Sequence, residues 1–469
     1  MTLRNWVCTI LLAGVCVNAA AQEKTNVVFI LADDLGYGDL GGYGQQLIET
    51  PHLDQLAAKG MKFTQFYAGT SVCAPSRASL MTGLHTGHTP IRGNYEIQPE
   101  GQLPLPKGTF TLGQLFKQAG YRTGVFGKWG LGYPGSEGTP NQQGFDEFFG
   151  YNCQRESHNF FPGHLWENDR RINYANTAKK QVVYAPEVIQ QKAMQFLDKN
   201  HTEPFFLFLT YTLPHAGLQL PAGDPLFEKY KKAFGESPKP IPAGWDGTGY
   251  QPQAYPHAAY AAMVSRLDQY VGEVVKKLEQ LGIAEHTLIV FASDNGPHRE
   301  GGNDPAFFNS SGGLRGVKRD LYEGGIREPL IAYWPSVIKE GSVSTHVGAF
   351  WDFLPTFAAL TAQRISVATD GLSILPTLQS MAHKQPKHQA LYWEFHEDGG
   401  RQAVRMGDWK GLRQGVMVQQ NAPLELYNLR SDPGETKDLS AQHPDIVQKI
   451  LAFMEKSHQE NKDFPFLSK

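Results

Sequence analysis

Short and almost entirely apolar runs, separated by segments of helical pattern, constrain the fold of this chain most. Residues 26–31, 205–209 and 287–291 are such runs, rich in Val, Ile, Leu and Phe. Runs of this kind are typical of parallel strands that are buried on both faces of a sheet. Helical patterns alternate with them, the longest over residues 258–282. The sequence therefore predicts an α/β fold with a large, mostly parallel central sheet flanked by helices.

The pattern changes after residue 375. Four short strand-like runs lie between residues 390 and 428, and a helical pattern follows over residues 444–456. This order predicts a smaller C-terminal antiparallel sheet with one helix. Because 469 residues exceed one ordinary core, we expect a large domain over residues 22–375 and a small α+β subdomain over residues 376–469.

The N-terminus has the layout of a secretory signal. A single charge, Arg4, precedes an apolar run over residues 6–17, and small residues follow up to residue 21. We expect residues 1–21 to be removed as a signal peptide and the protein to be exported to a bacterial periplasm, in preference to secretion or lipid attachment. No later segment has the roughly 18 uninterrupted apolar residues of a membrane span, so an integral membrane protein is not expected.

The net charge and the cysteine count limit which binding partners and which disulfides are expected. The formal net charge is −3, without the basic excess that is typical of a nucleic-acid-binding protein. Of the four cysteines, Cys8 and Cys16 fall within the expected signal peptide, so Cys73 and Cys153 remain. In an oxidising compartment these two could form a disulfide. If Cys73 is instead used chemically, Cys153 is left as a lone buried thiol.

Acidic and amide residues directly follow two of the apolar runs. Asp33 and Asp34 come after the first run, and Asp294 and Asn295 come after the third. Ligands of α/β sheets bind beyond the carboxyl ends of the strands, so these side chains are expected to meet. Three carboxylates would repel one another without a cation, and an all-oxygen set favours Ca²⁺, with Mg²⁺ second, over zinc. Either pair taken alone would more often form a turn.

Three cations and a histidine lie at strand ends or in glycine-rich loops: Arg77, Lys128, Lys318 and His215. Each alone is typical of ordinary surface or structural side chains. Together with a metal they describe a pocket for a tetrahedral oxyanion ester, which favours sulfuryl or phosphoryl transfer. Cys73 lies at a predicted helix start, where unpaired backbone N–H groups favour an anion, although a structural cysteine fits the same place.

Two signatures connect these residues to a known family. Residues 73–77 match the C-x-P-S-R motif, and residues 120–129, which end in Lys128-Trp129, match the second signature. On these motifs the chain resembles, over most of its mature length, the type I formylglycine-dependent sulfatases. These are the arylsulfatase-like enzymes of the alkaline phosphatase-like superfamily, and the likeness is greatest to bacterial carbohydrate sulfatases.

The resemblance implies a chemistry for the site. Cys73 would be converted to Cα-formylglycine by a formylglycine-generating or anaerobic sulfatase-maturing enzyme, and its hydrated aldehyde would attack sulfur to give a sulfated-enzyme intermediate. His215 would protonate the leaving oxygen, and Asp294 would accept the proton of the nucleophile. The implied catalytic residues are Cys73, Arg77, Lys128, His215 and Lys318, and the implied ligands of one Ca²⁺ ion are Asp33, Asp34, Cys73, Asp294 and Asn295.

One position departs from the family pattern. Many members have histidine after the Lys-Trp pair of the second signature, where this chain has Gly130. The usual hydrogen-bond partner or base for the formylglycine is then absent. His85, His88 or His298 could substitute for it, or His215 could serve both halves of the reaction.

The expected substrate is an extracellular carbohydrate that carries an O-sulfate at a chain end, with galactose or N-acetylgalactosamine sulfate favoured. Trp393 is the expected aromatic platform for the sugar. The candidate sugar contacts are Arg92, Asn94, His298, Glu300, Arg315, Trp393 and His396. Two alternatives stay open: a phosphodiesterase or phosphonate monoester hydrolase of the same superfamily, and a catalytically silent protein that binds sulfated glycan.

Overall fold

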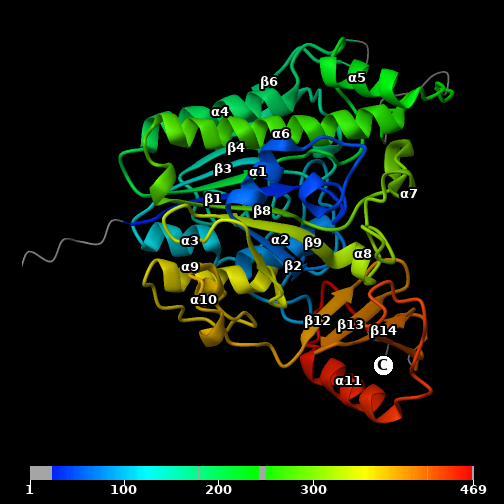
Figure 1. Ribbon diagram of the computed structural model, residues 1–469. Helices are drawn as coiled ribbons and strands as arrows, with labels where there is room; N and C mark the ends of the chain where they lie inside the picture. Colours follow the sequence, from blue (N-terminus) through cyan, green and yellow to red (C-terminus); the bar gives the residue numbers. More distant parts are fainter. Residues whose placement is uncertain (1–23, 178–179, 242–249, 420, 467–469) are drawn as a thin grey trace, which may run out of the picture.

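The computed structural model describes residues 24–177, 180–241, 250–419 and 421–466, so the predicted signal peptide lies outside the described residues. Within this part of the chain, eleven strands form one large sheet (Figure 1), in the order β10-β2-β9-β8-β1-β7-β3-β4-β5-β6, with β11 beside β2. These strands are β1 (Asn26–Ala32), β2 (Met61–Tyr67), β3 (Arg122–Lys128), β4 (Glu147–Tyr151), β5 (His164–Glu167), β6 (Arg170–Asn173), β7 (Phe205–Thr210), β8 (Thr287–Ser293), β9 (Arg327–Tyr333), β10 (Ser342–Ser344) and β11 (Gly348–Ala349).

The centre of this sheet is parallel, as the apolar runs predict. β1 pairs in parallel with β7 on one side and with β8 on the other, and β3 and β4 continue in parallel beyond β7. β9 is antiparallel to both β8 and β2. The predicted fold class, a mostly parallel central sheet in an α/β protein, is confirmed.

Helices cover both faces of the sheet (Figure 1). Val28 and Ile30 of β1 belong to the core that contains the long helices α4 and α6, whereas Val27 and Phe29 belong to the core that contains α3 and α9. This burial on both faces accounts for the absence of polar side chains between the ends of β1. The helices are α1 (Pro51–Lys59), α2 (Cys73–Thr82), α3 (Leu112–Gln118), α4 (Ala185–Asn200), α5 (Pro225–Phe234), α6 (Pro256–Gln280), α7 (Pro305–Phe308), α8 (Glu323–Ile326), α9 (Phe353–Leu360), α10 (Leu375–Leu378) and α11 (Pro444–Ser457).

The C-terminal part forms the expected small antiparallel sheet with one helix. Its strands, in spatial order, are β12 (Leu391–Phe395), β13 (Arg401–Met406), β14 (Trp409–Gln414) and β15 (Leu424–Asn428). Ile450 and Met454 of α11 pack on one face, and the other face packs against Tyr67 and Trp351 of the large domain. The predicted boundary after residue 375 falls within α10, whose Leu378 belongs to the large domain's core, and it stays a prediction.

The sequence reasoning missed several strands. β2 mixes polar with apolar residues and β4 contains a glycine, so neither has the continuous apolar pattern of β1.

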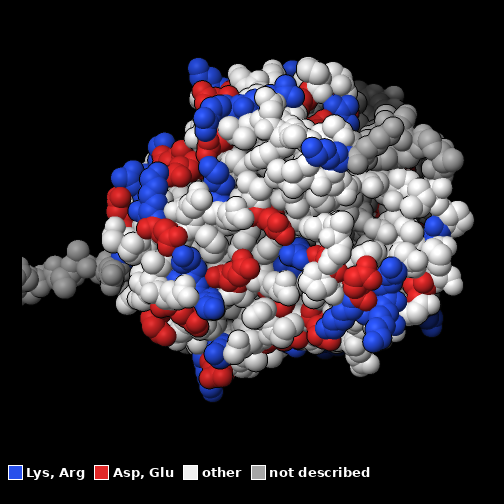
Figure 2. All heavy atoms as spheres, turned by 90° about the horizontal axis from the view of Figure 1, so that it is seen from above, with Lys and Arg blue, Asp and Glu red and all other residues white. Residues whose placement is uncertain are grey.

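No helix in the described ranges combines the length and apolar character needed to cross a membrane. On the face seen from above, basic and acidic side chains lie intermixed (Figure 2).

Candidate active site

The acidic residues meet where β1 and β8 end. Ala32 and Ser293 are register partners, so Asp33 and Asp294 leave the sheet side by side. The backbone N–H of Asp34 donates to Asp294 Oδ1 over 3.1 Å, and the backbone N–H of Asp33 donates to the carbonyl of Leu213 over 3.1 Å. The second contact fixes the loop after β7 against β1. Adjacent parallel strand ends therefore bring together side chains that are far apart in the sequence.

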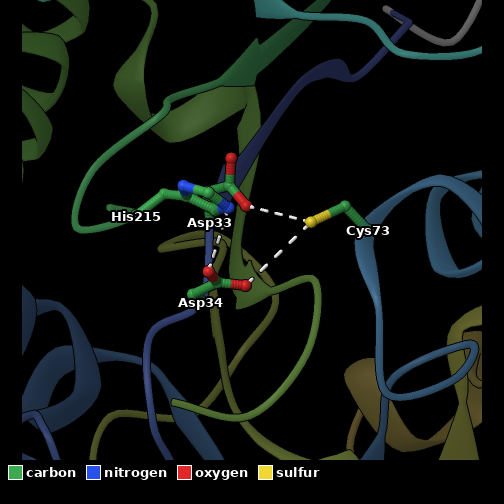
Figure 3. Close-up of side chains that lie close together, drawn as sticks. All are labelled: Asp33, Asp34, Cys73 and His215. Atoms are coloured by element: carbon green, nitrogen blue, oxygen red, sulfur yellow. Dashed lines mark hydrogen bonds and ion pairs between the residues drawn. The ribbon is translucent and has the colours of Figure 1, made fainter. Parts of the chain in front are cut away.

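Helix α2 presents Cys73 to this edge. Asp33, Asp34 and His215 lie on one side and the Cys73 thiol points at them from the other (Figure 3). Cys73 Sγ lies 3.4 Å from Asp33 Oδ1 and 4.0 Å from Asp34 Oδ1. Burial raises the pKa of the Cys73 thiol well above its usual value, so the thiolate form is disfavoured. An unmodified cysteine at this place is a poor nucleophile.

Each carboxylate faces a cation. Lys128 Nζ lies 2.7 Å from Asp33 Oδ2, and Lys318 Nζ lies 2.7 Å from Asp34 Oδ2. Burial opposes ionisation of both carboxyls, but these lysines hold the pKa of each at about 2. Both aspartates are therefore ionised at neutral pH.

The third carboxyl group, that of Asp294, ionises less readily than the other two. Arg77 Nε donates to Asp294 Oδ2 over 2.9 Å, and Arg77 Nη1 donates to the carbonyl of Lys128 over 2.8 Å. Burial and the neighbouring charge of Asp33 nevertheless raise the pKa of Asp294 to about 6. The three buried carboxylates thus face three buried cations, and Asp294 is the carboxyl whose ionised form is least stabilised.

A hard cation fits this arrangement. Oxygen atoms of Asp33 and Asp34, with Cys73 and His215, lie within 4.8 Å of one another, close enough to surround an ion. Asn295 Nδ2 donates to Asp34 Oδ1 over 2.7 Å, while its buried Oδ1 has no hydrogen-bond partner among the described residues. A free amide oxygen beside carboxylates is a donor set that suits Ca²⁺ or Mg²⁺.

His215 lies against the second lysine. Its Nε2 is 3.1 Å from Lys318 Nζ and 3.2 Å from Asp34 Oδ2, and its Nδ1 contacts the carbonyl of Ala216. The His158 ring stacks on it, with centroids 4.6 Å apart and planes inclined by 9°. Burial, followed by the charge of Lys318, holds the pKa of His215 well below its usual value. The imidazole is therefore neutral and fixed in orientation.

A cavity of about 230 Å³ opens onto these groups. Four residues predicted from the sequence line it, namely Cys73, Asn94, His215 and Lys318. The sequence reasoning missed the other lining residues, which are Glu96, Gln102, Gln154, Arg155, His158, Tyr250 and Arg319. Gln154 and His158 follow β4, so recognising β4 as a parallel strand would have pointed to the residues after its end.

The other predicted sugar contacts do not line this cavity. Arg92 is 2% exposed and donates to the carbonyl of Gln459, and His298 is fully buried. His396 pairs with Glu394 at 2.9 Å. Arg315 stacks on Tyr322 and donates to the carbonyl of Glu435, while Glu300 pairs with the cavity residue Arg319. The prediction that these residues contact the sugar is not supported by this geometry.

The prediction for Trp393 is wrong. Its ring is fully buried, packs against Tyr67 and Trp351, and donates from Nε1 to the carbonyl of Ala68 over 3.1 Å. The strand pattern explains this error, because alternate residues of β12 face the large domain. Trp393 is a core residue between the two sheets.

Replacing Trp393 by alanine is therefore expected to lower the free energy of unfolding by about 3–5 kcal/mol, since a large buried ring is lost. Urea unfolding of the variant and the wild-type protein measures this change. In the folded variant, KM for a sulfate ester is expected to stay within about twofold of the wild-type value, because a core residue does not touch the sugar. A large rise in KM without loss of stability would instead support the original prediction.

Of the histidines proposed to compensate for Gly130, His298 lies near Asp34, whereas His85 and His88 form a separate cluster. His85 and His88 stack on each other and lie against Asp370. His298 Nε2 lies 3.1 Å from the carbonyl of Pro214 and does not line the cavity. Cys73 and Cys153 are both free and buried, which excludes the disulfide between them in this structure.

Comparisons with known proteins agree with this geometry. The model of the sulfatase family matches residues 25–363, and that of the C-terminal region of N-sulphoglucosamine sulphohydrolase matches residues 316–462. Arylsulfatase A from Bos taurus is 32% identical to this chain, and the alignment covers 95% of this chain and 89% of the arylsulfatase. N-acetylgalactosamine-6-sulfatase from Rattus norvegicus is 32% identical to this chain, and the alignment covers 89% of this chain and 82% of the relative.

A solved structure is also similar. The crystal structure of Ps i-CgsB in complex with k-i-k-neocarrahexaose has 28% identity and a TM-score of 0.78, covering 95% of each chain. The match to the family model covers most of this chain, and the relatives are named sulfatases. The chain therefore belongs to the sulfatase family and is a sulfuric ester hydrolase.

Proposed function

We propose that this sulfatase removes an O-sulfate from the end of a carbohydrate chain, with galactose or N-acetylgalactosamine sulfate as the favoured substrate. The observation that carries this proposal is the buried cluster of Arg77, Lys128, Lys318 and His215 around the carboxylates beside Cys73. Of these residues, Cys73, His215 and Lys318 line the cavity. Relatives support the choice of sugar, because N-acetylgalactosamine-6-sulfatases and a protein in complex with neocarrahexaose are similar to this chain.

A metal ion and a modified Cys73 complete the proposed site. Asp33, Asp34, Asp294, Asn295 and residue 73 would hold Ca²⁺, which stabilises negative oxygen and lowers the pKa of a bound hydroxyl. Cys73 would be converted to formylglycine by a maturing enzyme and would then supply the nucleophilic oxygen that the buried thiol does not. The unpaired Oδ1 of Asn295 and the disfavoured thiolate of Cys73 are the observations that support these assignments.

The remaining side chains would bind the sulfuryl group and protonate the leaving oxygen. Arg77, Lys128 and Lys318 are all buried, so their charges act on sulfuryl oxygens with little screening by water. Because the imidazole is neutral in the free site, His215 would first take up a proton, which the negative charge of a bound sulfate ester favours. Its Nε2, beside Lys318, would then deliver that proton to the leaving sugar oxygen. The cations stabilise the charge that develops as the ester bond breaks.

The size of the cavity favours action at a chain end. Its volume is about 230 Å³, below the roughly 300–1,000 Å³ of pockets that enclose drug-sized ligands. One sulfated sugar ring fits such a space better than an internal stretch of a glycan does. We therefore favour exo action.

A screen of defined sulfated mono- and disaccharides, with free sulfate as the readout, tests this proposal. We expect release from a terminal galactose or N-acetylgalactosamine sulfate and slower release from internal positions. Nitrophenyl sulfate and the matching phosphate diester are compared in parallel, because preference for the diester would support the phosphodiesterase alternative. Binding of sulfated glycan without turnover, by a protein with an unmodified Cys73, would support the silent binder.

His215→Ala is expected to slow release from a sugar sulfate by about 10²- to 10⁴-fold, because an alkoxide leaves poorly without a proton. The loss with nitrophenyl sulfate is expected to be much smaller, since nitrophenolate needs little protonation. The ratio of kcat values for the two substrates measures the difference. Equal losses on both substrates would contradict the role of His215 as the acid.

Residues 1–21 are proposed to act as a signal peptide for export to the periplasm, and residues 22–375 and 376–469 to form the catalytic domain and the small subdomain. N-terminal sequencing of the protein purified from a bacterial host checks the first assignment, with residue 22 expected at the new terminus.

A further inference from the structure

Gly130 lies where a side chain has no room. Its φ is +75°, in the left-handed region that favours glycine, and a Cβ added there would lie 2.1 Å from Gln154 Nε2. Two backbone hydrogen bonds join the loop after β3 to the end of β4 and the residue that follows it. Trp129 N–H donates to the carbonyl of Tyr151, and Gly130 N–H donates to the carbonyl of Asn152. The Gln154 carboxamide therefore occupies the space beside Gly130.

Gln154 has a buried donor that is not used within the described protein. The residue is 6% exposed, and its Nε2 has no hydrogen-bond partner among the described residues. A buried amide without a partner is costly, so such groups usually serve a ligand or a water molecule. Gln154 lines the same cavity as Cys73, His158 and Lys318, which places its free donor among the groups that face the substrate.

We propose that Gln154 is a substrate-binding residue whose Nε2 donates to a sulfuryl oxygen of the bound ester, and that Gly130 is required because the carboxamide fills its side-chain space. This inference rests on the proposed function. A carboxamide does not exchange protons near neutral pH, so Gln154 positions and stabilises the sulfuryl group and does not act as a base. It adds a neutral N–H to the positive charges of Lys128 and Lys318.

The first test compares Gln154→Ala with Gln154→Glu in the full chain from a maturation-competent host with Ca²⁺. We expect Gln154→Ala to lower kcat/KM by roughly 10- to 100-fold, the usual effect of losing a donor to a charged oxygen. Gln154→Glu is expected to be worse at neutral pH, because a carboxylate repels sulfate, and to recover relative to wild type as the pH falls and the carboxyl becomes a donor. A merely structural glutamine would not produce this added pH dependence.

The second test uses Gly130. Gly130→Ala alone is expected to displace the carboxamide and to lower kcat/KM nearly as much as Gln154→Ala does. In the Gln154→Ala background the collision is absent and only the backbone strain of alanine at a positive φ remains. Gly130→Ala is therefore expected to lower stability in both backgrounds, but to add less than about a threefold further loss of kcat/KM in the Gln154→Ala background. Fully additive effects of the two substitutions would contradict the proposed relation between Gly130 and Gln154.

Binding of inorganic sulfate separates this inference from the proposed function. We expect Gln154→Ala to weaken sulfate binding by about tenfold or more, measured by calorimetry. The matched control is Gln143→Ala, another buried glutamine, whose Nε2 donates to the carbonyl of Glu137 over 2.8 Å and which lies outside this cavity. It is expected to lower stability while leaving sulfate binding unchanged.

The outcomes are distinct. Unchanged sulfate affinity and kcat/KM in Gln154→Ala would overturn the inference alone, as would an equal loss of binding in the Gln143→Ala control. Failure of the wild-type protein to bind sulfate or to release it from any ester would instead contradict the pocket itself, and the inference with it.

Discussion

Replacing Cys73 by alanine is expected to lower kcat/KM for a sulfate ester by about 10⁵-fold or more, because residue 73, which lies against Asp33 and Asp34, is proposed to supply the attacking oxygen. The protein should remain folded, since removing one buried sulfur costs only a small apolar contact. Sulfate release under single-turnover conditions and circular dichroism measure the two effects. Intact-mass measurement of the wild-type protein should show CHO in place of CH₂SH at residue 73.

Cys153→Ala is the matched control for this experiment. Cys153 is also free and buried, but its sulfur faces the carbonyl of Gly101 and lies away from the acidic cluster. We expect this variant to keep its activity within a few-fold of the wild-type value. Substantial activity in Cys73→Ala would contradict the role of residue 73, and an unmodified cysteine in an active wild-type protein would contradict the conversion to formylglycine.

Removing Ca²⁺ with EGTA is expected to lower kcat/KM by about 10²- to 10³-fold, because the metal supplies several kcal/mol of charge stabilisation. It is also expected to lower Tm by about 5 °C, since an ion that binds only the folded state stabilises it. Without the ion, the buried carboxylates of Asp33, Asp34 and Asp294 keep only their side-chain partners Lys128, Lys318 and Arg77. Activity and thermal unfolding are measured with EGTA, and again after addition of Ca²⁺ or Mg²⁺.

Asp34→Asn and Asp39→Asn provide matched variants for the metal experiment. Both aspartates are fully buried, but Asp39 accepts hydrogen bonds from the Gly36 backbone N–H and from Tyr260. Asp34→Asn is expected to abolish the difference in Tm between EGTA and Ca²⁺. Asp39→Asn is expected to keep that difference, because an asparagine carbonyl can still accept both bonds. Recovery with Mg²⁺ alone would reassign the metal.

The sequence predicted the buried central strands of the sheet and the polar residues directly after their ends. The apolar runs identified β1, β7 and β8 because strands buried on both faces tolerate few polar residues. The same rule located the residues beyond their ends, so Asp33 and Asp294 were found without any knowledge of contacts. Whether these side chains hold the metal and the sulfate stays a prediction.

The remaining lining of the cavity could not be predicted in the same way. Its residues come from loops, where no periodic pattern indicates direction. Gln154 was missed because β4 contains a glycine and has no continuous apolar run. Trp393 was misassigned because composition alone does not distinguish an aromatic residue that faces solvent from one packed between two sheets.

The complete burial of α2 sets an order of events during biogenesis. All ten residues from Cys73 to Thr82 are buried. The preceding loop is covered by β12, which is synthesised much later, because Thr70 donates to the carbonyl of Glu394 and Trp393 donates to the carbonyl of Ala68. If Cys73 is converted to formylglycine as proposed, the maturing enzyme must reach it before the C-terminal sheet docks. Folding and maturation would then compete for the same segment, so slower docking would favour complete conversion.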